Sequence, residues 1–411
     1  MITVENFTNK EVNFYFEGQN LHFKLSQSLF SSFDIDQGSK LLLKTIIKSL
    51  NLSKVKTVLD IGCGIGVLGI TLKSFNPHIR VFSQDRDALA VEFTRLNAES
   101  NRIKDIYSFG SLAMEFPPES TKPLSQGAIP PNRFDLLVSN LPAKAGEPVL
   151  RHIIKNAPYH STPDGTCAFV IVEPLKQLFK EELIKNDFEI LTEHSTKKHS
   201  VFIYRDRKNG HFTQPINPNP LIPYLRSTLE IDGKLTIETV YGIKNFDSLD
   251  FETELVLSLL HDSPLTGDTL IWNPYQGYIP VYLATNRKNK LNSITIVSRD
   301  YLSLSITEYN MKKTNYPRSK LRYIHHPFFD QQFYKSCNFN SAIVSLDHDP
   351  GIDYSKEILK ITEDPSFENT SLIISGKSHQ IAPLKKLVKK KNILKFKKNR
   401  GYSGIFIWFT H

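Results

Sequence analysis

Short apolar runs rich in β-branched residues alternate with longer amphipathic stretches along the first half of the chain. Four such pairs follow one another: KTVLDIG with GVLGITLKSF, IRVFSQD with DALAVEFTRLNAES, FDLLVSN with PVLRHIIKNA, and GTCAFVIV with PLKQLFKEELIKN. The apolar runs have the length of strands buried on both faces, and the amphipathic stretches are long enough for helices. The alternation predicts βαβ units that build a parallel sheet covered by helices.

The same order of elements returns after a proline-rich stretch at residues 207–225. Four landmarks of the first half recur at nearly constant offsets, Asp36 as Asp250, Gly66 as Gly277, Asp87 as Asp300 and Ser139 as Ser345. Prolines interrupt helices and strands, so the stretch is typical of a linker. We therefore expect two tandem α/β domains, residues 1–206 and 226–411, joined by a linker at 207–225. The alternative is a chance alignment of two unrelated α/β domains.

A glycine-rich turn, DIGCGIG at residues 60–66, joins an expected strand to the helix after it. Glycines at such a turn let the backbone approach a ligand closely. The GxGxG spacing departs from the GxGxxG of dinucleotide-binding proteins, because position 67 is Val. The next expected strand ends at Asp85, where a carboxylate can accept hydrogen bonds from both hydroxyls of a ribose. The pattern predicts an adenosine-containing ligand other than NAD, and helix capping or a surface ion pair is the alternative role for Asp60 and Asp85.

A third landmark, Asn140-Leu141-Pro142-Ala143, follows the expected strand FDLLVSN. The carboxyl ends of parallel strands meet at one edge of a sheet, and open α/β sheets bind their ligands there. We therefore expect Asn140 to lie beside the glycine turn and Asp85. Its alternative role is to cap a turn.

From LSQSLFSSFDIDQGSKLLL through VLDIGCGIGVLGI to FDLLVSNLPAKAG, residues 20 to 206 resemble the class I S-adenosylmethionine-dependent methyltransferases. The resemblance is greatest to the methyltransferase small domain group, which contains the tandem-domain bacterial ribosomal RNA guanine-N2 methyltransferases. It implies two Rossmann-like domains and catalysis by Asn140, Leu141 and Pro142. The methionine part of the cofactor would contact Asp60 and the glycines, and the ribose would contact Asp85. The complete cofactor-binding set that it implies is Phe30, Asp36, Gly38, Asp60, Gly62, Gly64, Gly66, Asp85 and Asn140.

The chemistry implied by this resemblance needs no nucleophile, metal or strong base, because a sulfonium is already a good leaving group. The protein's main task is to hold the acceptor in line with the methyl group at about 3 Å. An Asn side chain and the next backbone carbonyl can orient an exocyclic amine and draw off its positive charge. Amino-methylating relatives carry an aromatic residue where this chain has Ala143. Base stacking on such a ring is worth about 1–3 kcal/mol, so either another aromatic supplies this face or the acceptor is not a guanine.

The second half has lost these landmarks. By the offsets, Gly62 is replaced by Asn273, Gly64 by Tyr275, Asp85 by Ser298 and Asn140 by Leu346. Side chains in the turn keep a ligand away from the backbone, and the ribose loses its carboxylate. We expect a degenerate, non-catalytic second domain. In the bacterial relatives the degenerate copy comes first, so the order here is inverted.

Charge favours a polyanionic partner, since 51 Lys and Arg against 42 Asp and Glu give a net charge of +9. Nine of the basic residues form one run near the end of the chain. Beside a methyltransferase domain, this run predicts contacts with the phosphates of structured RNA, most simply ribosomal RNA; a solvated face of an amphipathic helix is the alternative. The expected RNA-binding residues are Lys385, Lys386, Lys389, Lys390, Lys391, Lys395, Lys397, Lys398 and Arg400.

Composition excludes several classes of protein. Hydrophobic residues make up 40% of the chain and charged residues 23%, as in globular proteins. No apolar run approaches about 18 residues and the start lacks a signal-peptide pattern, so we expect a cytoplasmic protein without a membrane segment. The three cysteines form no CxxC pair, and we expect neither a disulfide nor a metal site. Two further hypotheses stay open: an RNA-binding scaffold with a vestigial cofactor site, and a methyltransferase acting on nitrogen in a protein or small molecule.

Overall fold

The computed structural model describes residues 2–30, 33–116, 130–207, 219–231, 235–261, 263–388 and 392–408. The chain divides into two compact units, Phe7–Tyr224 and a second unit in which Met1–Asn6 joins Leu225–His411. Within the expected linker, residues 208–218 lie outside the described residues.

The first unit is built around a seven-stranded sheet with the strand order β5-β4-β3-β6-β7-β9-β8. Its strands are β3 (Thr57–Ile61), β4 (Arg80–Asp85), β5 (Ile106–Gly110), β6 (Phe134–Asn140), β7 (Ser161–Val172), β8 (Phe188–Ser195) and β9 (His199–Asp206). The helices are α1 (Gln37–Ser49), α2 (Val67–Phe75), α3 (Ala88–Ser100), α4 (Glu147–Asn156) and α5 (Lys176–Lys185). A hairpin of β1 (Lys10–Phe16) and β2 (Gln19–Leu25) precedes α1. Short 3-10 helices lie at Val4–Phe7, Leu52–Lys54, Ala143–Ala145, Ala157–His160, Glu173–Leu175 and Ile222–Tyr224.

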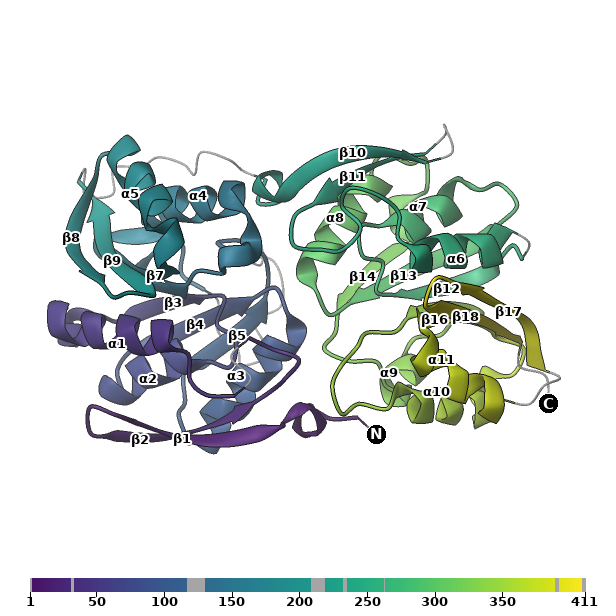
Figure 1. Ribbon diagram of the computed structural model, residues 1–411, viewed down its shortest axis with the longest axis horizontal. Helices are drawn as coiled ribbons and strands as arrows, with labels where there is room; N and C mark the ends of the chain where they lie inside the picture. Colours follow the sequence, from purple (N-terminus) through teal and green to yellow (C-terminus); the bar gives the residue numbers. More distant parts are fainter. Residues whose placement is uncertain are drawn as a thin grey trace. The chain divides into compact units, whose positions relative to one another are not determined.

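The expected parallel sheet is present from β5 to β7, with α1, α2 and α3 on one face and α4 and α5 on the other (Figure 1). Strand β3 is buried at all five of its positions, as its apolar sequence predicts. Strand β9 differs from this expectation, because it runs antiparallel to both β7 and β8. Only residues 196–198 separate β8 from β9, which is too short for a parallel crossover.

The second unit repeats this topology with the strand order β14-β13-β12-β15-β16-β18-β17. Its strands are β12 (Thr266–Trp272), β13 (Lys290–Ser298), β14 (Leu321–His325), β15 (Ser341–Ser345), β16 (Ser371–Lys377), β17 (Ile393–Asn399) and β18 (Tyr402–Trp408). A hairpin of β10 (Leu225–Ile231) and β11 (Leu235–Val240) precedes the first helix, as β1 and β2 do in the first unit. The helices are α6 (Phe251–His261), α7 (Tyr278–Thr285), α8 (Tyr301–Met311), α9 (Gln331–Ser336), α10 (Tyr354–Glu363) and α11 (Ser378–Leu387), with 3-10 helices at Arg318–Lys320 and Pro365–Phe367.

An asparagine on the third helix of each unit ties the hairpin to the turn after the central strand. Asn97 accepts a hydrogen bond from the backbone N–H of Lys24 at 2.8 Å and donates one to the carbonyl of Ile65 at 2.9 Å. Asn310 of α8 makes the equivalent two bonds, to β11 and to the second turn. Because the topology and these contacts both recur, the fold is a tandem pair of Rossmann-like α/β domains, as the sequence predicts.

Strand register corrects one detail of the expected repeat. The backbone N–H of Leu141 donates to the carbonyl of Val170 at 3.0 Å, and that of Leu346 makes the matching bond at 2.9 Å to the next strand of its own sheet. Leu346 therefore corresponds to Leu141, and the counterpart of Asn140 is Ser345. The expected pairing of Asn140 with Leu346, and of Ser139 with Ser345, was wrong by one residue.

Candidate functional site

The three glycines of the first turn have two different roles. Gly62, Gly64 and Gly66 all have positive φ values of 73°, 55° and 86°. A Cβ atom at Gly66 would lie 2.8 Å from Cδ1 of Ile70 and 3.3 Å from the backbone Cα of Thr94, so glycine there serves packing as well as the positive φ. By contrast, no heavy atom of the described chain lies within 4 Å of a Cβ position at Gly62 or Gly64. The space in front of these two glycines is therefore open to a ligand.

Asp60, at the end region of β3, lies directly beneath this turn. Its side chain is fully buried, and Oδ2 accepts a hydrogen bond from the backbone N–H of Gly69 in the first turn of α2 at 3.0 Å. Its other oxygen, Oδ1, is buried without a partner among the described residues. Burial, reinforced by the Asp85 carboxylate, raises the pKa of Asp60 to about 7. One oxygen of Asp60 thus accepts a hydrogen bond from the N-terminal turn of α2, and the other can accept a hydrogen bond from a further donor.

Asp85, the last residue of β4, holds the turn from the neighbouring strand. Its Oδ2 accepts a hydrogen bond from the backbone N–H of Gly64 at 3.0 Å, and Oδ1 accepts one from the N–H of Asp87 at 2.9 Å. The capping of α3 is done by Asp87, whose side chain accepts from Leu89. Burial, with the Asp87 charge adding to it, raises the pKa of Asp85 to about 6. Helix capping therefore does not account for Asp85.

The block before the sheet meets the end of β6 at the N-terminus of α1. Oδ2 of Asp36 accepts hydrogen bonds from the backbone N–H of Ser39 at 3.1 Å and from Nδ2 of Asn140 at 2.8 Å. Nδ2 of Asn140 also donates to Oγ of Ser39 at 3.1 Å. A Cβ atom at Gly38 would lie 2.8 Å from Oδ2 of Asp36 and 3.1 Å from Cδ2 of His199, so a side chain there would displace one of these two groups.

The remaining predicted residues of the first domain are placed less closely. Leu141 is buried and its backbone N–H belongs to the sheet, whereas Pro142 and Ala143 are exposed. Phe30 lies in the turn region after β2 with its side chain 72% exposed, and the structure does not bring it into the hydrogen-bonded cluster. Its contact with a cofactor stays a prediction.

Two residues near this edge were missed by sequence reasoning. His199 opens β9, and its approach to Gly38 follows from the antiparallel hairpin that the sequence pattern did not predict. Gln84 is buried next to Asp85, and its Nε2 donates to Oγ of Ser111 at 2.8 Å and to the carbonyl of Leu112 at 3.1 Å. The sequence signal that could have found Gln84 is an amide side chain directly before Asp85, at the end of an apolar strand.

The second turn keeps the backbone conformation of the first but fills it with side chains. Asn273 and Tyr275 occupy the positions of Gly62 and Gly64 with positive φ values of 57° and 51°. Nδ2 of Asn273 donates to Oδ2 of Asp347 at 2.6 Å, and Nζ of Lys244 lies 3.8 Å from the centre of the Tyr275 ring. The open space of the first domain is thus closed here.

Ser298 replaces Asp85 at the end of the second strand. Its Oγ accepts a hydrogen bond from the backbone N–H of Asp300 at 3.1 Å. This bond matches the one that Asp85 accepts from the N–H of Asp87. A hydroxyl cannot supply the charged acceptor that a carboxylate offers to a ribose. The second domain therefore lacks the first domain's features both in the turn after β12 and at the end of β13.

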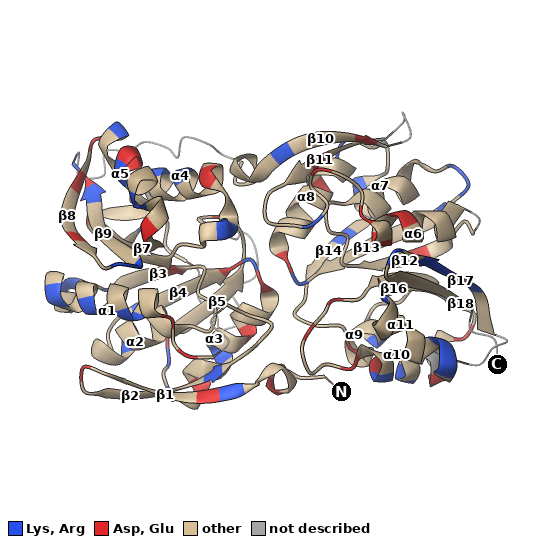
Figure 2. Ribbon diagram, viewed as in Figure 1, with Lys and Arg blue, Asp and Glu red and all other residues tan. Residues whose placement is uncertain are grey.

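The basic run does not form one amphipathic helix. Lys385 and Lys386 lie in the last turn of α11. Lys395, Lys397 and Lys398 lie on the edge strand β17, and Arg400 lies in the turn to β18 (Figure 2). Lys389, Lys390 and Lys391 lie outside the described residues. The helix expected as the alternative to RNA contact was wrong, because alternating apolar residues pair this segment with β18.

These basic side chains are not equally available to a partner. Nζ of Lys395 donates to Oγ of Ser263 at 3.0 Å, and Nζ of Lys397 donates to the carbonyl of Ser258 at 2.9 Å. The exposed members of the run are Lys385, Lys386, Lys398 and Arg400.

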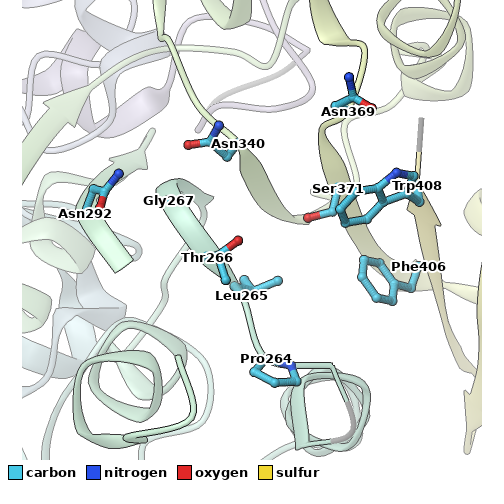
Figure 3. Close-up of a pocket in the computed structure, with 10 residues that line it drawn as sticks. All are labelled: Pro264, Leu265, Thr266, Gly267, Asn292, Asn340, Asn369, Ser371, Phe406 and Trp408. Carbon is cyan, nitrogen blue, oxygen red and sulfur yellow. The ribbon is translucent and has the colours of Figure 1, made fainter. Parts of the chain in front are cut away.

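A separate hollow of about 320 Å³ lies at the opposite edge of the second sheet (Figure 3). Thr266 and Ser371, the first residues of β12 and β16, line it together with Trp408. Asn340, also at its wall, holds β12 in place by accepting from the backbone N–H of Asp268 at 2.8 Å. The hollow is therefore not the counterpart of the first domain's turn, which lies at the carboxyl edge.

No group of three or more His, Cys, Asp and Glu side chains in the described part of the chain could hold a metal ion. Among the same residues, no helix is long and apolar enough to span a membrane.

Comparison with known proteins finds similarity over the first domain. Residues 20–203 match the family model described as Methyltransferase small domain. This match confirms that the first domain resembles the methyltransferase small domain family, as the sequence predicts. Relatives named Ribosomal RNA small subunit methyltransferase C match in part. That of Buchnera aphidicola subsp. Baizongia pistaciae is 30% identical over 198 residues, which are 46% of this chain and 54% of the relative. That of Haemophilus influenzae (strain Rd) is 27% identical over 195 residues, 45% of this chain and 51% of the relative.

The chain thus spans about half the length of the curated relatives it matches. A solved structure matches the whole chain in fold. The 16S rRNA N2 G1207 methyltransferase of T. thermophilus, in complex with AdoMet and guanosine, has a TM-score of 0.64 and 14% identity, with 100% of both chains covered. This likeness supports the tandem Rossmann-like fold.

Proposed function

We propose that the protein is an S-adenosylmethionine-dependent methyltransferase that methylates an exocyclic amine, guanine N2, of ribosomal or other structured RNA. Residues 1–206 would be the catalytic domain and residues 226–411 the degenerate one, with the linker between them. The family match over residues 20–203 and the names of the partial relatives support this proposal. An RNA of the ribosome as substrate would also place the protein in the cytoplasm.

The open turn is the observation that carries the proposal. Gly62 and Gly64 leave free space where side chains would otherwise stand, and Asp60 has a buried oxygen without a partner among the described residues. These features fit the amino-acid part of S-adenosylmethionine, whose ammonium group would satisfy Oδ1 of Asp60. Asp85, fixed by the N–H of Gly64, would accept from the ribose hydroxyls. When bound, the cofactor supplies a methyl group attached to a sulfonium. Transfer of the methyl group releases a neutral thioether, which needs neither an acid nor a metal to leave.

Asn140 would position the acceptor. Both of its hydrogen bonds use Nδ2, because the carboxylate of Asp36 accepts and does not donate. The amide is therefore oriented with Oδ1 directed away from Asp36, and Oδ1 can accept a hydrogen bond from an amine. As positive charge develops on that amine, the same bond strengthens, so it lowers the barrier to transfer. In this proposal Asp36 is a positioning residue for Asn140.

The second domain would contribute RNA contacts. The side chains in its turn leave no open space for the cofactor, whereas Lys385, Lys386, Lys398 and Arg400 present charge to the solvent. Such contacts with phosphates give affinity without sequence preference. The acceptor amine itself would be selected in the first domain.

Transfer of a labelled methyl group tests this function. The protein is incubated with tritiated S-adenosylmethionine and ribosomal subunits, and the label is then measured in RNA, in protein and in small molecules. We expect label in RNA. Label in ribosomal protein or in small molecules alone would replace the RNA acceptor by one of the alternatives, and cofactor binding without transfer would favour an RNA-binding scaffold.

A further inference from the structure

The exposed aromatic residues of the first domain offer a substitute for the ring that is missing at position 143. Ala143 is exposed and follows the end of β6, so no aromatic face stands at that point of the site. Among the described residues of this domain, the aromatic side chains with large exposure are Tyr15 at 73%, Phe30 at 72% and Phe33 at 65%. Water-exposed phenyl rings are common singly, so their setting decides what they mean.

The backbone is anchored at Phe33 and at the residues that follow it. Nζ of Lys10, on β1, donates to the carbonyl of Phe33 at 2.7 Å. The next residue, Asp34, forms an ion pair with Lys40 at 3.1 Å, and Ile35 is 2% exposed. The ring of Phe33 is thus exposed although its own carbonyl and both following residues are fixed. Because the backbone that carries the ring is already ordered, a ligand that covers the ring need not order this segment.

Phe33 is also close to the cluster that holds Asn140. It lies three positions before Asp36, so its Cα atom is at most about 11 Å from that of Asp36 even in a fully extended chain. Asp36 is hydrogen-bonded to Asn140, and the ring can extend several ångströms from its own Cα.

We propose that Phe33 supplies the aromatic face against which the acceptor base stacks. The stacking surface that position 143 does not offer would come instead from the segment before α1, on the same anchored turn that ends in Asp36. This inference rests on the proposed function and adds to it a residue that selects planar acceptors. It is the counterpart of Asn140: the ring holds the plane of the base and the amide holds its amine.

Steady-state methylation of in vitro transcribed small-subunit ribosomal RNA tests the proposal. Phe33→Ala should raise KM for the RNA roughly tenfold or more, the size expected when one base–aromatic stack is removed, while cofactor affinity measured by calorimetry stays at the parent's value. Phe33→Tyr should restore the parent's KM, whereas Phe33→Leu, which is apolar but not planar, should not. Tyr15→Ala removes an equally exposed ring on β1 and should leave KM unchanged.

An active parent enzyme whose KM is unaffected by Phe33→Ala overturns this inference alone. Full activity of Phe33→Leu also overturns it, because the contact would then be apolar and not a stack. A tenfold rise in KM for His199→Ala, without one for Phe33→Ala, would assign the aromatic face to the imidazole beside Gly38. A parent protein that methylates no RNA overturns both this inference and the proposed function.

Discussion

Nδ2 of Asn140 donates a hydrogen bond to Oδ2 of Asp36 at 2.8 Å, although the two are 104 positions apart in the chain. The bond joins the end of β6 to the N-terminus of α1. It also decides which end of the Asn140 amide remains for a ligand, since the carboxylate can only accept. The segment before the sheet therefore acts on the acceptor side of the site through one side-chain pair.

Replacing Asn140 tests this arrangement. Asn140→Ala should lower the single-turnover rate about a hundredfold or more at saturating cofactor, because its bond to the amine strengthens in the transition state. Affinity for S-adenosylmethionine should change little. The matched control is Ser345→Ala, the same register position in the second sheet, which should leave the rate unchanged. Equal rates for Asn140→Ala and the parent would reduce Asn140 to a turn residue.

Calorimetric titration with S-adenosylmethionine tests the two turns. We expect one bound equivalent, because side chains close the second turn. Asp85→Ala should weaken binding at least tenfold, since charge-assisted hydrogen bonds to the ribose are each worth about 1.5–3 kcal/mol. Ser298→Ala, at the matching strand end, should leave affinity and stoichiometry as they are. Two bound equivalents would refute the degenerate second domain.

The sequence predicted the features that depend on local pattern. Buried β-branched strands and the glycine turn depend on residues within a short stretch, and the repeat was recognised because such stretches recur in the same order. Asp85 was found because it ends such a strand. The hairpin of β8 and β9 was missed because exposed polar residues of β8 break its apolar pattern. The contact of His199 with Gly38 depends on that hairpin and could not be foreseen without it.

Two further errors have a physical cause. The sequences at the ends of β6 and β15 can be aligned in two ways. Only the hydrogen bonds across the sheet show that Ser345, and not Leu346, corresponds to Asn140. For the run from Lys385 to Arg400, the alternative to RNA contact, a single amphipathic helix face, was wrong. Its alternating apolar residues instead make part of it an edge strand, in which lysines also discourage pairing with other chains.

The buried carboxyl group of Asp60 predicts a pH-dependent stability. Its pKa of about 7 in the folded state exceeds the ordinary value of about 3.9 expected in the unfolded chain. Between these values the folded protein binds more protons, so this group makes the free energy of unfolding fall as pH rises from about 4 to about 7. Asp60→Asn should remove that fall while keeping an acceptor for the N–H of Gly69.

Denaturant unfolding of the ligand-free protein at several pH values checks this. The quantity to follow is the difference in unfolding free energy between Asp60→Asn and the parent, in which the titration of all other groups largely cancels. The difference should move in favour of the variant as pH rises through this range. A difference that does not change with pH would show that Asp60 titrates normally.

Salt dependence tests the basic residues of the second domain. Changing Lys386, Lys398 and Arg400 to Gln should weaken RNA binding about equally for cognate and unrelated sequences. The slope of log affinity against log salt concentration should become shallower by up to about three, roughly one for each phosphate that the variant no longer neutralises.

The matched control for this experiment is the exposed lysine triple Lys54, Lys104 and Lys185 of the first domain, changed to Gln, which removes the same charge elsewhere. Thermal melting shows whether either triple variant is misfolded. A slope that changes equally in both triples would indicate a general charge effect, and an unaltered slope would leave the edge strand with a structural role only.

Nucleoside mass spectrometry tests the central claim most directly. Unmodified small-subunit ribosomal RNA is incubated with S-adenosylmethionine and the parent protein, Asn140→Ala or Ser345→Ala, and then digested to nucleosides. The parent and Ser345→Ala should produce N2-methylguanosine, and Asn140→Ala should produce about a hundredth as much in the linear phase of the reaction. A different methylated nucleoside, or equal N2-methylguanosine from all three proteins, would contradict a guanine amine positioned by Asn140 of the first domain.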